Sequence, residues 1–186
     1  MLSALSCDGP VVFMEHKLLS ITWREALGSG GRKNVRYDVP AAGERGPVPN
    51  AWKPLPFGQA EVRREGSDVT LASLGVSVHR ALQAAEQLGR QGVQAEVIDL
   101  RTVAPLDREL LVGSVRKTGR VVVVDEDYRE CGLSGELAAV LLEAGLTPKY
   151  ARVCTEGTIP YARALEDATL PNVRRIAEAA LRLATG

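Results

Sequence analysis

The sequence predicts an α/β fold, built on a doubly wound, mostly parallel sheet with one antiparallel edge strand. Three short runs rich in apolar residues support this prediction: residues 68–75, 95–100 and 120–125. Each run is followed by a predicted helix. Strands that alternate with helices along a chain are typical of parallel sheets that are covered by helices on both faces.

The first unit joins the strand at residues 68–75 to a helix predicted over residues 77–90. One face of that helix is apolar and carries Val78, Ala81, Leu82, Ala85 and Leu88. Ser77 is predicted to cap the start of the helix, because its hydroxyl can accept a hydrogen bond from a backbone N–H group. Phosphate binding at Gly75 and Ser77 is the alternative, although the dinucleotide-binding fingerprint needs three glycines where this chain has one.

The second unit begins with the strand at residues 95–100, whose apolar run is typical of a strand buried on both faces. A helix is predicted to open at Pro105, whose ring presets the backbone angle of a first helical turn. Asp107 places negative charge where the helix dipole favours it. Asp99 and Arg101 flank the corner between strand and helix, and we expect an ion pair between them that fixes the loop.

The third unit joins the most β-prone run, residues 120–125, to a helix predicted over residues 133–143. Three consecutive acidic residues lie at the end of the strand: Asp125, Glu126 and Asp127. Convergent carboxylates could share a proton or bind a cation. Consecutive side chains of an extended chain point to opposite sides, so we expect these three to face solvent or a partner without converging.

The residues before the first unit have a different composition. A short strand is predicted at residues 10–14, whereas residues 1–6 are too few for a stable isolated helix. Residues 21–57 carry many glycines and prolines and are predicted to be a linker. Residues 58–66 are predicted to form an antiparallel edge strand with little burial.

The C-terminal part is predicted to add one strand and two helices. The strand covers residues 150–154. The helices cover residues 162–168 and 173–183, with Pro171 as a break between them. Apolar residues of the last helix form one stripe, which we expect to pack on the sheet or on a partner.

The overall composition bounds the class of function. Acidic and basic side chains number 23 each in a chain of 186 residues, so the overall charge favours neither nucleic acid nor an anionic membrane surface. No apolar run approaches the ~20 residues of a membrane span, and the first residues lack the pattern of a signal peptide. A soluble cytoplasmic protein is therefore expected.

Cysteines and histidines indicate no metal or catalytic site. Cys7, Cys131 and Cys154 lack CxxC spacing and are predicted to be structural or incidental, with Cys154 buried as a small apolar side chain. His16 and His79 are the only histidines, which are too few for a typical zinc site. His79 has no neighbour in sequence that would orient it as a base. The residues by themselves therefore predict a fold and no reaction.

Four stretches carry a resemblance to a known family: residues 13–19 (FMEHKLL), 58–70 (GQAEVRREGSDVT), 99–107 (DLRTVAPLD) and 159–162 (IPYA). They resemble the beta subunit of the decarboxylase component of 2-oxo acid dehydrogenase complexes, whose pyruvate, branched-chain 2-oxo acid and acetoin versions look alike in this region. The third stretch is shared more widely with transketolase-like enzymes. Residues 131–136 depart from the family's glycine-rich pattern, which leaves the substrate class open.

The resemblance implies three parts: a remnant of a pyrimidine-binding domain (residues 1–20), a linker (21–57) and a transketolase C-terminal-like domain (58–186). In the family, the pyrimidine-binding domain supplies the glutamate that activates thiamine diphosphate, and this sequence has no counterpart of that glutamate. No catalytic, cofactor-binding or metal-binding residue is therefore carried over. We expect thiamine diphosphate and magnesium in the complete enzyme, and neither tight cofactor binding nor catalysis by this chain alone.

The resemblance also implies a function in assembly. The expected partners are the alpha subunit of the decarboxylase component, a second beta subunit and the dihydrolipoyl acyltransferase core. The partner interface is carried over onto Glu126, Arg129, Glu136 and Tyr161. Two alternatives stay open: a stand-alone interaction or regulatory module, and the C-terminal part of a deoxyxylulose phosphate synthase-like enzyme.

Overall fold

A computed structural model describes residues 1–16, 19, 51 and 53–186. The predicted linker at residues 21–57 lies mostly outside the described residues. Among the helices of the described part, none is long and apolar enough to cross a bilayer.

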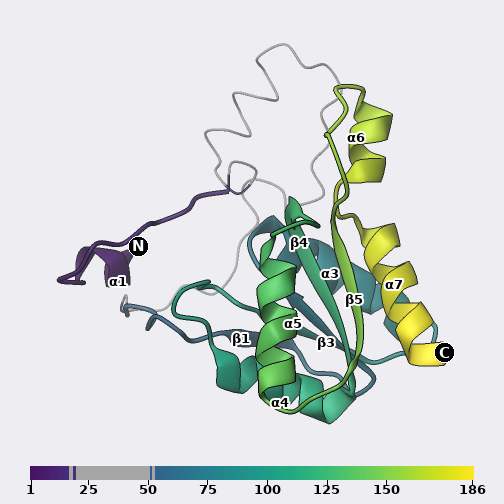
Figure 1. The fold of residues 1–186 in the computed structure, drawn as a ribbon, viewed down its shortest axis with the longest axis horizontal. Helices are drawn as coiled ribbons and strands as arrows, with labels where there is room; N and C mark the ends of the chain where they lie inside the picture. The colour runs from purple at the N-terminus through teal and green to yellow at the C-terminus, as the bar shows by residue number, and fades with distance from the viewer. Residues whose placement is uncertain (17–18, 20–50, 52) are drawn as a thin grey trace.

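A five-stranded sheet with strand order β1-β3-β2-β4-β5 forms the centre of the molecule (Figure 1). Neighbouring strands are parallel except for β1, which pairs antiparallel with β3 at one edge. The predicted fold class and the predicted antiparallel edge strand are therefore confirmed. The strands are β1 Glu61–Arg64, β2 Val69–Ser73, β3 Ala95–Asp99, β4 Arg120–Tyr128 and β5 Lys149–Thr155.

Helices cover both faces of this sheet. Helices α3 and α7 close an apolar core on one face, and α4 and α5 close a second core on the other (Figure 1). This arrangement confirms the doubly wound architecture. The helices are α1 Leu2–Leu5, α3 Val76–Gly89, α4 Arg108–Thr118, α5 Leu133–Glu143, α6 Arg163–Thr169 and α7 Val173–Thr185.

Alternating side chains of the strands supply the two cores. On β2, Val69 and Leu71 lie in the core under α3 and α7, whereas Ala72 lies in the core under α4 and α5. Successive side chains of a strand point to opposite faces, so each strand contributes to both cores. All of β2 is buried, as expected for a central strand of a parallel sheet.

The strand predicted at residues 10–14 does not form. These residues adopt no regular structure, and most of their side chains are exposed. A strand is stable only when a neighbouring strand takes up its backbone hydrogen bonds, and none in the described part does so for this segment. A short helix, α1, forms instead at the extreme N-terminus, with Leu5 N donating to Met1 O at 3.0 Å.

Two predicted helix starts are displaced. The N-cap of α3 is Gly75, whose φ of 59° lies in the left-handed region that glycine tolerates. Ser77 therefore lies inside the helix, buried, and does not cap it. Helix α4 begins at Arg108 rather than at Pro105, because Asp107 caps it by accepting a hydrogen bond from Leu110 N at 3.0 Å.

Candidate functional site

The carboxyl ends of β2 and β4 form the natural place for a site in this sheet. The chain leaves β2 through α3 toward β3 on one side, and leaves β4 through α5 toward β5 on the other. Doubly wound sheets bind their ligands where neighbouring crossovers diverge in this way. The two strand ends are tied together, since Ser73 Oγ donates to Val124 O at 2.9 Å.

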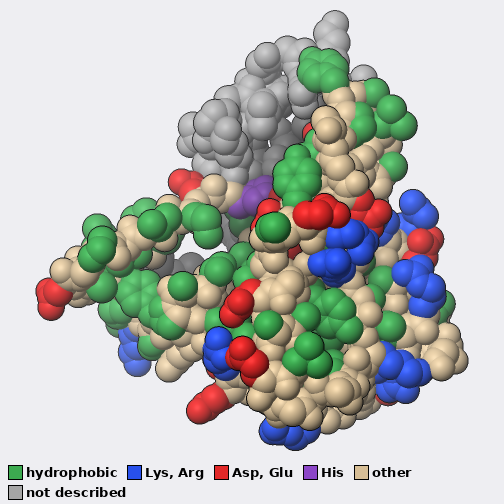
Figure 2. Space-filling view, in the orientation of Figure 1, with side chains coloured by type: hydrophobic (Ala, Val, Ile, Leu, Met, Phe, Trp, Pro, Cys, Tyr) green, Lys and Arg blue, Asp and Glu red, His purple; other side chains and the backbone are tan. Residues whose placement is uncertain are grey.

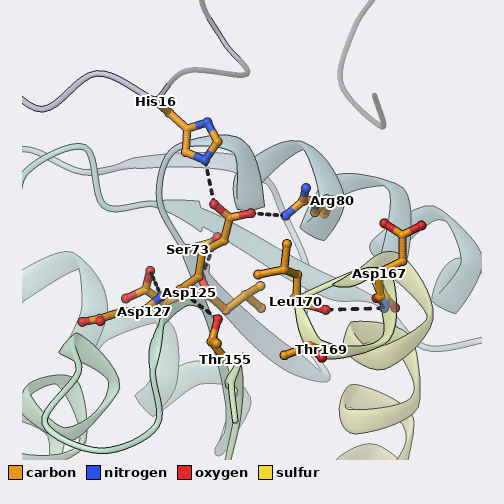
Figure 3. Close-up of polar contacts among 12 residues, drawn as sticks. His16, Ser73, Arg80, Asp125, Asp127, Thr155, Asp167, Thr169 and Leu170 are labelled. Carbon is orange, nitrogen blue, oxygen red and sulfur yellow. Dashed lines mark hydrogen bonds and ion pairs between the residues drawn. The ribbon is translucent and has the colours of Figure 1, made fainter. Parts of the chain in front are cut away.

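A three-residue ion-pair cluster lies at this edge, formed by Glu126, His16 and Arg80, and is called the Glu126 cluster below. His16 Nε2 lies 2.6 Å from one carboxylate oxygen of Glu126, and Arg80 Nη1 lies 2.5 Å from the other (Figure 3). The three residues come from the N-terminal segment, α3 and β4. The backbone of Glu126 is also fixed, because Thr155 Oγ1 donates to its carbonyl oxygen at 2.6 Å. The cluster therefore attaches the N-terminal segment to the sheet.

Glu126 is ionised in this setting. Burial raises the pKa of its carboxyl, but the hydrogen bond from His16 and the charge of Arg80 outweigh that effect, so its pKa lies below the ordinary 4.5. The Arg80 side chain is only 7% exposed, whereas that of Glu126 is 27% exposed. A buried guanidinium needs a carboxylate partner, and Glu126 provides it from within the chain.

Asp125, Glu126 and Asp127 do not converge, as the sequence predicted. Asp125 Oδ1 accepts from Asp127 N at 3.3 Å (Figure 3). Asp127 Oδ1 accepts from Tyr128 N at 2.7 Å. Burial raises the pKa of Asp125 above its ordinary 3.8. The prediction that all three face solvent or a partner is wrong for Glu126, which is paired within the chain. Within the described part, no three His, Cys, Asp or Glu side chains are placed to hold a metal ion.

The ion pair predicted between Asp99 and Arg101 has a different partner. The Arg101 guanidinium pairs with Glu61 of the edge strand β1. Asp99 instead accepts a hydrogen bond from the backbone N of Arg101 at 3.1 Å, which fixes the corner where Arg101 has a φ of 57°. A hollow of about 460 Å³ lies beside this corner, lined by residues 58–60 and 106–109. Its lining brings no set of reactive groups together.

The other predicted interface residues lie at the same end of the sheet. Arg129, just after β4, pairs with Glu156. Glu136, in the first turn of α5, lies 3.6 Å from Arg108 Nη2, and both side chains are largely exposed. Tyr161, between β5 and α6, is 87% exposed.

Several large apolar side chains are exposed on the segments that end or follow β4 and β5. We call them the carboxyl-edge patch, and they are Tyr128, Ile159, Tyr161 and Leu165. Charged side chains cover the neighbouring surface in Figure 2. Exposed aromatic residues with a polar surround are typical of contact surfaces between proteins.

Sequence reasoning missed the partners of Glu126. His16 lies 110 positions before Glu126, and no local pattern links the two. Arg80 left a weak signal, since it falls on the buried side of α3 beside Ala81 and Ala84. A charged residue at a core-facing position indicates a buried partner of opposite charge. His79 is half-buried in the first turn of α3 and is not one of the three residues of the Glu126 cluster.

Comparison with known proteins supports the resemblance. A family model described as "Transketolase, C-terminal domain" matches residues 58–176. The pyruvate dehydrogenase E1 component subunit beta of Staphylococcus epidermidis is 39% identical over 162 residues, which cover 86% of this chain and 43% of that protein. The 2-oxoisovalerate dehydrogenase subunit beta of Bacillus subtilis is 41% identical over 141 residues, covering 76% of this chain and 37% of that protein.

One solved structure is similar in both sequence and fold. It is described as a split-gene transketolase in an inactive beta4 tetramer, with a TM-score of 0.66 and 33% identity. The match covers 74% of this chain and 47% of that one. The chain spans less than half the length of these relatives.

Proposed function

The chain belongs to the transketolase C-terminal domain family, and from that membership we propose that it is the assembly domain of a 2-oxo acid dehydrogenase beta subunit. The names of the similar proteins support this proposal, since they are beta subunits of dehydrogenases for pyruvate and 2-oxoisovalerate. The complete enzyme would use thiamine diphosphate and magnesium to decarboxylate a 2-oxo acid. Its partners would be the alpha subunit, a second beta subunit and the dihydrolipoyl acyltransferase core.

The carboxyl-edge patch is the observation that carries this proposal. At an edge where related sheets bind small ligands, the charged side chains here pair with one another, and the exposed surface is aromatic and apolar. Such a surface suits protein contact better than catalysis. Tyr161 is the best anchor of the proposed interface because tyrosine buries a large area at low cost in conformational entropy.

The charged interface residues take different roles in this proposal. Glu136 is exposed, Arg129 is half-buried, and both supply the polar rim. Glu126 acts indirectly, because its carboxylate is occupied by His16 and Arg80 and it positions the N-terminal segment. Rim charges contribute mainly to the rate and specificity of association, so the largest loss of affinity is expected at Tyr161.

The described residues do not fit the cofactor. Magnesium needs several oxygen ligands in one place, and the described part holds no group of three candidate ligands. Arg80, a buried cation at the carboxyl edge, pairs with Glu126. In the proposed assembly, other parts of the enzyme hold thiamine diphosphate.

A binding experiment tests the interface. The immobilised chain should retain purified alpha subunit or acyltransferase of a bacterial 2-oxo acid dehydrogenase, and Tyr161→Ala should weaken retention about tenfold or more, as at an interface hot spot. Leu142→Ala is the matched control, since Leu142 is also an exposed apolar residue but lies on α5 outside the patch. Failure to retain either partner, or equal losses in both variants, would contradict the proposal.

Calorimetry tests whether this chain binds the cofactor by itself. Titration of the chain with thiamine diphosphate and magnesium should show no micromolar binding, and the chain alone should release no carbon dioxide from a 2-oxo acid. The physical reason is the lack of a suitable ligand set in the described residues. Micromolar binding by this chain would show that it holds the cofactor itself.

The tetramer in the similar structure also supports self-association. A beta chain of that protein is described as forming a tetramer in an inactive state. We therefore propose that this chain associates with a second copy of itself, which would correspond to the contact between two beta subunits in the complete enzyme.

A further inference from the structure

Residues 156–169 follow β5 and carry most of the carboxyl-edge patch. Ile159, Tyr161 and Leu165 all lie in this stretch, which is called the patch segment below. The chain has no regular structure here up to residue 162 and then forms α6. Figure 1 shows α6 beyond the carboxyl ends of β4 and β5. The proposed interface therefore lies mainly on a segment that projects from the sheet.

Burial of side chains does not hold the patch segment in place. Among the side chains of residues 156–169 that the structure describes, none is buried and most are exposed. A segment without buried apolar side chains gains little from the hydrophobic effect, which elsewhere offsets the conformational entropy lost on ordering. Polar contacts at the ends of the segment therefore matter for its conformation.

Arg175, in the first turn of α7, contacts both ends of the patch segment. Its Nη1 donates to Thr169 O at 2.5 Å, where α6 ends. Its Nη2 donates to Cys154 O at 3.1 Å, just before the segment begins, and to Glu156 Oε1 at 3.3 Å. The planar fork of a guanidinium can hold several acceptors in a fixed arrangement. One side chain thus joins the two ends of the segment.

The position of Arg175 is costly for a cation unless these contacts compensate for it. A positive side chain in the first turn of a helix opposes the helix dipole, and this one is only 17% exposed. Asn172 makes a second connection at the same place. Its Oδ1 accepts from Arg175 N at 2.9 Å, and its Nδ2 donates to Asp167 O of α6 at 2.7 Å. The start of α7 therefore holds the end of α6.

Glu156 extends this network to the polar rim of the proposed interface. Its carboxylate pairs with Arg129 as well as with Arg175. The hydrogen bond from Arg129 lowers the pKa of Glu156 below its ordinary 4.5, so the carboxylate is ionised at neutral pH. Arg129 N also donates to Thr155 O at 2.9 Å. A rim residue and the patch segment are therefore fixed by the same network.

We propose that Arg175 is a positioning residue of the interface, which holds the patch segment in the conformation that a binding partner recognises. This inference rests on the proposed function and adds to it a residue outside the patch. Binding to a segment that is already ordered avoids the entropy cost of ordering it on association. Arg175 therefore contributes to affinity through Tyr161 and its neighbours.

Affinity measurements on the full chain test this role, with the purified alpha subunit or acyltransferase that the wild-type chain retains. Arg175→Met removes the hydrogen bonds at both ends of the segment and should raise the Kd about tenfold, because the partner must then order the segment. Arg174→Met is the matched control. Arg174 is the neighbour of Arg175 on α7, is 69% exposed and pairs with Glu178, so its replacement removes the same charge and should leave the Kd unchanged.

A double-mutant cycle and hydrogen exchange separate positioning from a general loss of stability. Arg175→Met should cost less affinity in the Tyr161→Ala background than in the wild type, since residues that act through one another are not additive. Amides of residues 156–169 should exchange faster in Arg175→Met, by more than those of β2. Arg175→Lys keeps the charge but not the fork, so its Kd should be intermediate. The Lys variant carries the test if circular dichroism shows that the Met variant does not fold.

The outcomes distinguish this role from the proposed function. The positioning role would be overturned by an unchanged Kd of Arg175→Met, by an equal loss in Arg174→Met, by additive losses with Tyr161→Ala, or by unchanged exchange of the patch segment. Each of these results leaves the proposed function standing as long as the wild-type chain binds and Tyr161→Ala binds more weakly. A wild-type chain that retains neither partner would overturn the proposed function and the positioning role together.

Discussion

The polar residues at the two ends of the sheet differ in where their partners lie. At the amino end, Thr70 of β2 contacts Ser114 Oγ at 2.7 Å and Thr118 Oγ1 at 2.8 Å, all buried. On the neighbouring strand, the Glu96 side chain is 2% exposed and pairs with Lys117 of α4. These groups find their partners within the domain, between the sheet and a single helix.

At the carboxyl end, some polar residues have partners from outside the domain. Its main ion-pair cluster includes His16 from the N-terminal segment, which lies outside the matched family domain. Ser77 and Ser134, near the starts of α3 and α5, have buried hydroxyls with no partner in the described part of the chain. Polar residues at the amino end therefore pair within the domain, whereas Glu126 at the carboxyl end connects the domain to the N-terminal segment through His16.

Breaking the buried ion pair at the amino end should have the largest effect on stability. Lys117→Met leaves the Glu96 carboxylate buried without its cation, and loss of one member of such a pair costs about 3 kcal/mol of unfolding free energy. Urea denaturation at neutral pH measures this loss. A loss below about 1 kcal/mol would show that the amino end is not a stability element of the kind proposed.

The same ion pair offers an internal control. Lys117 also pairs with Glu65, whose side chain is 80% exposed, so Glu65→Gln should change the unfolding free energy by less than about 0.5 kcal/mol. Burial raises the pKa of Glu96, but hydrogen bonds from Lys117 and Ser114 hold it below 4.5 overall. The ion pair therefore stabilises the fold above that pH, and the deficit of Lys117→Met should shrink in more acidic solution.

Removing one hydroxyl at the amino end should have an intermediate effect. Thr70→Val keeps the shape of the side chain but deprives Ser114 and Thr118 of a hydrogen-bond partner, which costs about 1 kcal/mol. Thermal unfolding measures the difference, with Thr70→Ser as the variant that keeps the hydroxyl. A Val variant as stable as the wild type would show that the remaining partners satisfy both groups, among them Arg120 O for Thr118.

The sequence predicted the elements that depend on local patterns. The three strand and helix units were confirmed, and helix α5 begins and ends at the predicted residues, because apolar periodicity within each unit reports which side is buried. The strand predicted at residues 10–14 was wrong, since β-propensity cannot say whether a partner strand is present. The predicted start of α3 was also wrong, because Gly75 and not Ser77 is the N-cap of this helix.

The candidate site was less predictable than the fold. Asp125, Glu126 and Asp127 were identified as strand-end carboxylates, and their failure to converge followed from strand geometry. The pairing of Glu126 with His16 and Arg80 depends on how distant segments pack, which sequence spacing does not encode. The proposed roles of Arg129, Glu136 and Tyr161 came from family resemblance, and they stay predictions until binding is measured.

The smallest expected effect is at the carboxyl end and concerns pH. Burial raises the pKa of Asp125 above its ordinary 3.8, so the unfolded chain loses this proton at lower pH than the folded chain. Ionisation therefore reduces stability as pH rises from 3.8 through the folded pKa. Asp125→Asn cannot ionise, and its amide oxygen can still accept the hydrogen bond from Asp127 N.

The Asn variant should therefore gain stability over the wild type as pH rises through this window, by less than about 1 kcal/mol at neutral pH. Chemical denaturation across the acidic range measures the gain, and Glu86→Gln on the exposed side of α3 should show none. If only Asp125→Asn gains stability, the ionised Asp125 destabilises the fold at neutral pH. Such a cost is expected where a charged group serves a contact beyond the domain. A loss at neutral pH would mean that the Asp125 charge stabilises this end, and the contrast between the two ends would then be weaker than the geometry indicates.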